Sequence, residues 1–374
     1  MFRFNHSPAL LARLAMIAAI AVSAMPADAQ TWSSSENDPS KYVEHSAKLS
    51  SGGWVEIHNE YGDLHVNTEG STGEVKIKAR LDANGDDQDA AKLLERLKLN
   101  IDENAGKVVI KGGLNGEIKR MTDNENGTKI VFNDGEKLKV DDFTIDIWVT
   151  MPRKANLEIY QTFGDIEVGD LEGELQLKSS YSDFELGSIK GKVEINPSFA
   201  DGTAEFIQEG HITLEYGDME IEEAFTLFLE SSFSGFEIGR AELIKSTRGY
   251  NDYEIEYVNA IELDEEFSEL EIDELGIKGE IEITYGSIEL KMKPGFEALE
   301  IDADFGEIEI ELPEDDEFKL DLYAEMGEIN FPKHLEIQTD DKGMLSRHII
   351  AHNKEGSKLV KLHSSYGSMK VELD

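Results

Sequence analysis

A short pattern of apolar and polar positions recurs along the chain between residues 163 and 331. It begins with an aromatic residue, continues with a small residue and an acidic or small residue, and ends with two apolar residues that flank a polar one. Clear copies begin at Phe163, Tyr181, Tyr216, Phe233, Tyr250, Phe267, Tyr285 and Phe305, and weaker copies at Phe199 and Met326. Most successive copies start 17 or 18 residues apart. A fixed period of this kind is typical of a stacked repeat protein.

A second apolar alternation follows within most repeats, as in Leu175-Gln-Leu177 and Ile281-Glu-Ile283. Two short strands and two corners fill such a repeat, which is too short for a helical crossover. We therefore predict an all-β fold, a parallel β-solenoid of the single-stranded β-helix type with coils of about 17–18 residues. The first aromatics alternate between Phe and Tyr from residue 163 to residue 305, so a doubled unit stays open. An antiparallel meander is the other alternative.

The small residue after each aromatic suits a corner that turns tightly or takes positive φ. The aromatic side chains before these corners are expected to stack as a ladder. The predicted corner residues are Gly164, Ser182, Gly217, Ser234, Asn251, Ser268, Gly286, Gly306 and Gly327.

The regions on either side of the repeats differ from them. Residues 51–151 predict an N-terminal β section, interrupted by one short amphipathic helix over residues 87–99. Residues 152–331 hold the solenoid repeats, and residues 332–374 predict closing coils that cap them. This last region carries more Lys, Arg and His than the rest, including His348 and His352, which we interpret as a surface pair.

The first residues have the features of a targeting segment. Arg3 and Arg13 precede a short apolar run that ends near Ala27-Asp-Ala29. Residues 1–29 therefore predict a signal peptide, and the polar residues 30–50 a flexible leader. We expect export to the periplasm, the cell surface or the medium, and no transmembrane segment in the mature chain.

The net charge of the chain limits the classes of partner that it can bind. The chain has a formal net charge of −42 and no Cys, which argues against binding to nucleic acid or anionic lipid and excludes disulfides and thiol chemistry. An unknown protein or polysaccharide of the envelope is the expected partner.

The polar residue between the two apolar positions of the pattern is nearly always Glu. In stacked coils these residues form one column, in which neighbouring charges about 5 Å apart repel by roughly 0.8 kcal/mol in bulk water. A solvated acidic face is the first interpretation, and a column that binds Ca²⁺ is the alternative, although no calcium-loop motif is present. The column comprises Glu220, Glu237, Glu254, Glu271, Glu289 and Glu309. No other metal and no cofactor is expected.

Motifs of catalysis are missing from the sequence: it contains neither Gly-x-Ser-x-Gly nor His-Glu-x-x-His. We predict that the protein is not an enzyme and assign no catalytic residue. A carbohydrate-active β-helix enzyme is the third alternative for function.

Residues from Gly53 to Leu312 resemble the exported bacterial putative-adhesin family of β-solenoid proteins, which is related to the head domains of auto-transporter adhesins. The resemblance lies in the opening strand pair from Trp54 to Val66, the passage that begins at Leu93, the Pro-containing segment from Ile147 to Leu157, and the Gly-Asp-apolar repeats at Gly164 and Gly217. It implies a non-enzymatic adhesin or scaffold of the cell envelope, here with extended acidic faces. A cation-binding or envelope-stress accessory protein is the second alternative.

Overall fold

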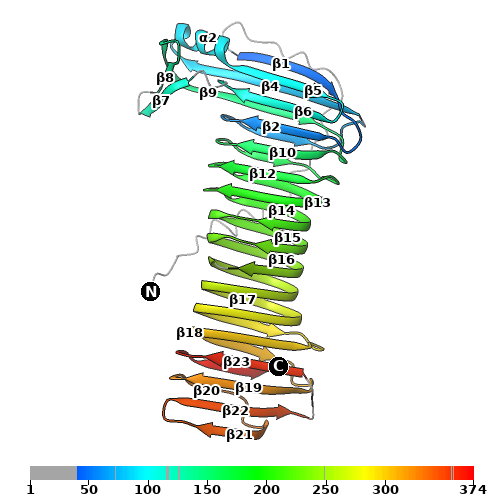
Figure 1. Ribbon diagram of the computed structural model, residues 1–374, viewed down its shortest axis with the longest axis vertical. Coiled ribbons are helices and arrows are strands. Elements are labelled where there is room, and N and C mark those ends of the chain that lie inside the picture. Colours follow the sequence, from blue (N-terminus) through cyan, green and yellow to red (C-terminus); the bar gives the residue numbers. More distant parts are fainter. Residues whose placement is uncertain are drawn as a thin grey trace. The chain divides into compact units, whose positions relative to one another are not determined.

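The repeats form a parallel β-solenoid in the computed structural model (Figure 1). The structure describes residues 40–71, 73–114, 118–124, 127–247, 249–354, 356 and 358–374. The predicted signal peptide and residues 30–39 of the predicted leader lie outside the described residues.

Each repeat makes one coil. Ile166 pairs with Phe184, and Ile221 pairs with Ile238, so the register advances by 18 or 17 residues from strand to strand. All pairings in this region are parallel, which excludes the meander, and consecutive copies of the pattern lie directly on one another, which excludes a doubled coil. The strands are β10 (Asn156–Gln161), β11 (Ile166–Val168), β12 (Leu175–Ser180), β13 (Phe184–Ser198), β14 (Gly202–Ile212), β15 (Glu215–Leu229), β16 (Ser232–Thr247), β17 (Tyr250–Met292) and β18 (Ala298–Leu312).

The core runs through the middle of the coils. In β15, Met219 and Ile221 from the first alternation and Leu227 and Leu229 from the second are buried, whereas Glu220 and Phe228 within the two alternations are not. Fully burying one such side chain contributes about 1.5–3 kcal/mol. Burial of the same positions in every coil therefore stabilises the stack without a long-range core.

The N-terminal section begins the stack and then covers it. Strands β2 and β3 lie parallel to β10 and β11, so they form the first coil. Strand β6 continues the stack beyond β2, and β9 continues it beyond β3. Strand β4 pairs antiparallel with β1 and with β9. The strands are β1 (Ser40–Lys48), β2 (Trp54–Asn59), β3 (Leu64–Asn67), β4 (Glu74–Gly85), β5 (Lys98–Asn104), β6 (Lys107–Gly113), β7 (Ile118–Asn124), β8 (Gly127–Phe132) and β9 (Lys137–Thr150).

Two predicted boundaries in this section change. The helix α2 covers Asp87–Arg96 and not residues 87–99, because Leu97 is already extended and Lys98 begins β5. Asp86 caps its first turn by accepting a hydrogen bond from the Gln88 N–H at 3.1 Å. The leader was expected to reach residue 50, but residues 40–48 are ordered as β1 through their pairing with β4.

The C-terminal strands do not follow the order of the sequence. Strand β23 lies between β18 and β19 (Figure 1). Strand β24 lies between β18 and β20. Strands β21 and β22 pair antiparallel beyond β19. The last strands of the chain are therefore inserted into the stack, and the segments before them form its outer end. These strands are β19 (Phe318–Glu325), β20 (Ile329–Asn330), β21 (Glu336–Lys342), β22 (Ser346–Asn353), β23 (Lys358–Ser364) and β24 (Met369–Leu373).

Candidate functional site

The outward side chains of the coils are arranged in columns, and these columns are the candidate functional surface. The most regular column is a ladder of aromatic rings. Its neighbouring ring centroids are 4.6–5.9 Å apart and the ring planes differ by 3–16°. The ladder consists of Tyr61, Phe163, Tyr181, Phe199, Tyr216, Phe233, Tyr250, Phe267, Tyr285, Phe305 and Tyr366. Because each ring covers the face of the next, the ladder presents ring edges to solvent.

In several coils the aromatic residue of the ladder has a strained backbone conformation. Tyr181, Phe199, Tyr216 and Phe233 have φ of 56–59°, a left-handed conformation that costs a non-glycine residue roughly 1–2 kcal/mol. A stacked aromatic pair contributes about 0.5–1.5 kcal/mol. Only four rings of the ladder carry this strain, whereas every step of the ladder is a stacked pair, so stacking summed over the ladder is large enough to offset it.

Positive φ was expected at the corner residues, but in several coils it is found at the aromatic residue before the corner or at Met326. Gly164 and Gly286 have φ of 99° and 150°. Gly217 does not, because Tyr216 before it already makes the left-handed turn. The same holds for Ser182, Ser234 and Gly327, which follow Tyr181, Phe233 and Met326.

Close stacking explains the small size of the corner residues. A Cβ atom on Gly217 would lie 2.0 Å from the carbonyl oxygen of Ala200 in the preceding coil, and one on Gly286 would lie 1.8 Å from that of Ser268. Where the residue is Ser or Asn, its side chain is buried and bonds to backbone, as in the 2.5 Å hydrogen bond from Ser268 Oγ to the Asn251 carbonyl. At Gly306, a Cβ would lie 2.3 Å from the carbonyl oxygen of Gly286.

The third position of the pattern forms a ladder of aspartates that the sequence analysis did not assign. Asp201 Oδ1 accepts a hydrogen bond from the Asp218 N–H at 2.9 Å, and Asp218 Oδ1 accepts one from the Gly235 N–H at 3.1 Å. The same bond joins Asp63 to Asp165, Asp183 to Asp201, and Asp252 to Glu269. The recurrence of Asp directly after the corner was the signal for this role.

The glutamates between the two apolar positions lie in register. Glu220, Glu237 and Glu254 pair side by side across β15, β16 and β17, and Glu289 pairs with Glu309 across β17 and β18. Glu271 lies between Glu254 and Glu289, whose charges both act on it. Toward the N-terminus, Thr203 separates Glu220 from Glu185 and Glu167. We call the stack of Glu220, Glu237, Glu254, Glu271, Glu289 and Glu309 the glutamate column.

Burial and repulsion within these columns both raise the pKa of carboxyl groups in them. Burial raises the pKa of Glu237, and the charges of Glu220 and Glu254 raise it further. The pKa of Glu271 is raised in the same way, by burial and by the charges of Glu289 and Glu254. Among the aspartates, burial and the charge of Asp201 raise the pKa of Asp218.

Lysine and histidine side chains of the end segments lie against the ends of these acidic stacks. Lys370 of β24 forms an ion pair with Glu309, the last rung of the glutamate column. At the other end, the His65 ring lies 2.8 Å from Glu167. Strand β23 places Lys361 at 2.5 Å from Glu300 and His363 at 3.0 Å from Asp302. Lys361 and Lys370 of the C-terminal region thus act as counterions to the solenoid.

His348 and His352 do not form a metal site with each other. His348 Nε2 lies 2.8 Å from Asp321, and His352 Nε2 lies 3.1 Å from Gln338. Within the described part of the chain, no group of three or more His, Asp or Glu side chains is placed to hold a metal ion. Binding of Ca²⁺ by the glutamate column therefore stays a prediction.

One polar cluster lies inside the coils and was also missed from the sequence. Glu265 is 1% exposed and accepts hydrogen bonds from Ser246 Oγ at 2.5 Å and from Tyr253 OH at 2.7 Å. Asn251 Nδ2 lies 3.4 Å from its second oxygen. Burial raises the pKa of Glu265. Its position in a run of acidic residues gave no signal that this carboxyl points inward.

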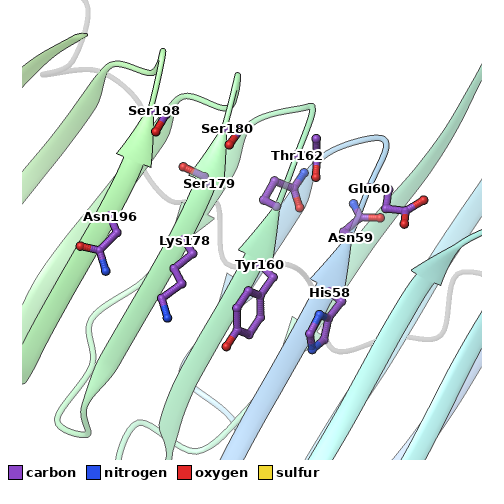
Figure 2. Close-up of a pocket in the computed structure, with 11 residues that line it drawn as sticks. His58, Asn59, Glu60, Tyr160, Thr162, Lys178, Ser179, Ser180, Asn196 and Ser198 are labelled. Atoms are coloured by element: carbon purple, nitrogen blue, oxygen red, sulfur yellow. The ribbon is translucent and has the colours of Figure 1, made fainter. Parts of the chain in front are cut away.

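A hollow of about 450 Å³ opens on the second-strand side of the first coils. Figure 2 shows His58, Tyr160, Lys178 and Asn196 projecting from successive strands on this side. Ser180 and Ser198 lie where their strands end. The hollow is lined by ammonium, amide, hydroxyl, imidazole and phenol groups and by the carboxylate of Glu60.

This architecture, a β-solenoid with ordered side-chain columns, defines the structural class of the protein. A model of the Toastrack DUF4097 family matches residues 98–372, so the chain belongs to that family. No curated protein sequence matches the chain.

Solved structures similar to the chain include proteins of three bacteria. A putative cell adhesion protein of Clostridium sporogenes ATCC 15579 is 10% identical, with 89% of this chain and 100% of that chain covered and a TM-score of 0.17. A putative adhesin of Bacteroides fragilis NCTC 9343 is 10% identical, with 89% and 97% covered and a TM-score of 0.26. A putative adhesin of Parabacteroides distasonis ATCC 8503 is 11% identical, with 89% and 97% covered and a TM-score of 0.30.

The described residues contain no helix that is long and apolar enough to span a membrane.

Proposed function

We propose that the protein is an exported, non-enzymatic adhesin or scaffold of the cell envelope, which binds a cationic partner through the glutamate column. The observation that carries this proposal is the end of the column. There, Lys370 of the inserted strand β24 forms an ion pair with Glu309 and occupies the next rung of the stack. The chain itself thus provides an example of how a cationic strand engages these carboxylates.

The unfilled rungs favour the same interaction. Stacked carboxylates repel one another, and this repulsion contributes to the raised pKa values of Glu237 and Glu271. A cation placed beside two rungs relieves repulsion as well as gaining attraction. Several weak contacts at a regular spacing also act together, which suits a partner with repeated positive charge. The adhesin names of the similar solved proteins agree with a surface-binding role.

The test uses the exported form of the protein, purified from cells that express the whole chain. Its affinity for a peptide with Lys at alternate positions is measured over a range of salt concentrations, and a peptide with Glu at those positions is the control. We expect saturable, salt-sensitive binding of the Lys peptide. The variant Glu220→Gln/Glu237→Gln/Glu254→Gln should weaken this binding about tenfold or more, which corresponds to about 1.4 kcal/mol.

A matched variant separates the column from overall charge. Glu174, Glu297 and Glu314 are exposed glutamates outside the column, so their replacement by Gln removes the same charge without touching it. Equal losses of affinity in the two triple variants, or no binding of the Lys peptide, would contradict the proposal.

A further inference from the structure

The aromatic ladder leaves a continuous apolar strip on the surface of the solenoid. Ten of its rings are 39–57% exposed, and their centroids follow one another in steps of 4.6–5.7 Å. Soluble proteins seldom expose a contiguous apolar area of this kind unless something binds to it. The ten rings belong to Phe163, Tyr181, Phe199, Tyr216, Phe233, Tyr250, Phe267, Tyr285, Phe305 and Tyr366.

The area of this strip is large enough for a stable interface. An aromatic side chain has about 200 Å² to bury, so the ten rings at these exposed fractions leave about 900 Å² per chain. Two such strips in full contact bury about 1,800 Å², and specific protein–protein interfaces bury about 1,200–2,000 Å².

The geometry of the rings limits what can cover them. Each ring face is covered by the next ring, as at Tyr216 and Phe233, whose planes are 4° apart. A cation or a sugar, which would bind to a ring face, therefore finds only ring edges along the strip. A partner that covers many rungs must also repeat at the same spacing, because a mismatch would grow from rung to rung. The strip of a second copy of this chain has this spacing.

Two polar columns border the strip and differ in chemistry. The residue before the ring carries a hydroxyl group in six of the ten coils, as at Ser198, and a carboxylate in three, as at Glu215. The residue two positions after the ring is acidic in seven coils, as at Asp201 and Asp218. Two copies packed antiparallel would bring the two acidic columns together. Packed parallel, the hydroxyl column of each copy lies against the acidic column of the other.

We propose that the protein forms a two-fold symmetric dimer in which two copies lie side by side and parallel, with ladder against ladder. Rings of the same residue number meet at each level, so tyrosine hydroxyl groups meet in pairs and can bond to each other. Hydroxyl groups such as that of Ser198 donate to carboxylates such as that of the partner's Asp201. The glutamate column, which begins two residues beyond Asp218, stays outside the contact.

This contact and the cationic partner of the glutamate column respond to salt in opposite directions. Carboxylates of both copies border the strip, and Glu215 lies against the partner's Asp218. Raising the salt concentration from about 0.1 M to about 1 M shortens the screening length from roughly 10 Å to roughly 3 Å, which strengthens the dimer and weakens binding of the Lys peptide. The dimer does not depend on the peptide site, so the variant Glu220→Gln/Glu237→Gln/Glu254→Gln should keep it.

Sedimentation velocity of the exported protein at several concentrations measures the equilibrium at both salt levels. We expect a reversible equilibrium of monomer and dimer with a lower dissociation constant at the higher salt. Phe199→Asn/Phe233→Asn keeps residues that tolerate the left-handed φ at these positions, and should raise the dissociation constant about tenfold or more because four rings leave the contact. Tyr42→Asn/Phe225→Asn is the matched control, since these residues are 44% and 53% exposed and lie outside the ladder.

A charge variant tests the same contact with every ring in place. Ser198→Glu puts a carboxylate opposite the partner's Asp201 and should raise the dissociation constant at low salt more than at high salt. Gln176→Glu adds the same charge on the second strand, away from the ladder, and should have little effect. Far-UV circular dichroism of each variant checks that the fold is kept.

Single thiols test the parallel orientation. The chain has no Cys, so Ser180→Cys and Thr284→Cys each introduce one thiol toward opposite ends of the ladder. In the parallel dimer each thiol lies at the level of its own counterpart, so a short bifunctional maleimide should crosslink both variants. The proposal is overturned by a chain that stays monomeric at every concentration and salt level, by equal effects of either variant and its control, or by the absence of both crosslinks.

Discussion

The ring of Tyr366 stacks on the ring of Phe305, with centroids 4.7 Å apart and planes 3° from parallel. Between these two residues the chain passes through β19 to β23. The contact therefore joins the inserted C-terminal coil to the solenoid and continues the aromatic ladder across a break in sequence order. Hydrogen bonds from Ser365 Oγ to Asp304 at 2.9 Å and from the Tyr366 N–H to the Asp304 carbonyl at 2.7 Å hold the same junction.

Replacement of Tyr366 by Ala tests this junction. The variant loses one stacked pair beside β24, so we expect the free energy of unfolding to fall by about 1–2 kcal/mol. Tyr42→Ala is the control, because Tyr42 is similarly exposed, at 44% against 48%, and lies outside the ladder. Chemical denaturation measures both. Equal losses for the two variants would show that the stack at Tyr366 does not stabilise the protein.

Corner size gives the second prediction. Gly217→Val places a Cβ against the Ala200 carbonyl of the preceding coil, and Gly286→Val does the same at Ser268. Each substitution should lower the free energy of unfolding by about 1–3 kcal/mol, since packed backbone must move apart. Glu220→Gln, three residues from Gly217 and outward-facing, should not lower it. If the Val variants melt like the wild type, the coils are not stacked as closely as the structure places them.

The third prediction concerns the pH dependence of stability at Glu265. Burial raises its pKa in the folded protein, so the native state binds this proton more tightly than the unfolded state does. The stabilising contribution of the protonated form is present at low pH and is lost as pH rises through the folded pKa. Glu265→Gln keeps a neutral group at all pH values. The free energy of unfolding of the wild type should therefore increase relative to that of the variant as pH falls from 7.

Denaturation of both proteins between pH 7 and pH 4 measures this difference. Glu297→Gln, which removes an exposed carboxylate between β17 and β18, is the control and should show no comparable trend. A difference between wild type and Glu265→Gln that is constant over this range would mean that Glu265 does not titrate with a raised pKa.

The repeated pattern was enough to predict the coil, because the structure of a coil depends only on its own residues and on the coils next to it. Alternation fixes which residues face inward, as at Met219 and Ile221, and the fixed period fixes which residues become neighbours, as at Glu220 and Glu237. The aromatic ladder follows from the same period. These features do not depend on how distant parts of the chain meet.

The order of the end coils could not be predicted for the opposite reason. Tyr61 stacks on Phe163, and Tyr366 lies on Phe305 ahead of the coil that contains Met326. The presence of a copy of the pattern in the sequence does not determine which coil it will stack on. The ion pair of Lys370 with Glu309 helps to place the last copy of the pattern on the coil of Phe305. In the sequence, this placement was indicated by the Lys in the last copy, where most other copies have Glu.

Calcium provides the fourth prediction, which concerns the alternative role of the glutamate column. If carboxylates of adjacent rungs bridge Ca²⁺, millimolar Ca²⁺ in a constant high-salt background should raise the melting temperature saturably. The variant Glu237→Gln/Glu254→Gln/Glu271→Gln should reduce that rise. A melting temperature that Ca²⁺ leaves unchanged in the wild type would reject calcium bridging and leave a solvated acidic face.

The stability of this same triple variant at low salt tests the central claim most directly, which is that glutamates of successive coils are stacked in one column. Removing three rungs relieves repulsion with their neighbours, so the free energy of unfolding should rise by about 1–3 kcal/mol at low ionic strength. The gain should nearly vanish at about 1 M salt, where the screening length is roughly 3 Å. A variant that is less stable than the wild type at low salt would contradict the column and the coil register on which it depends.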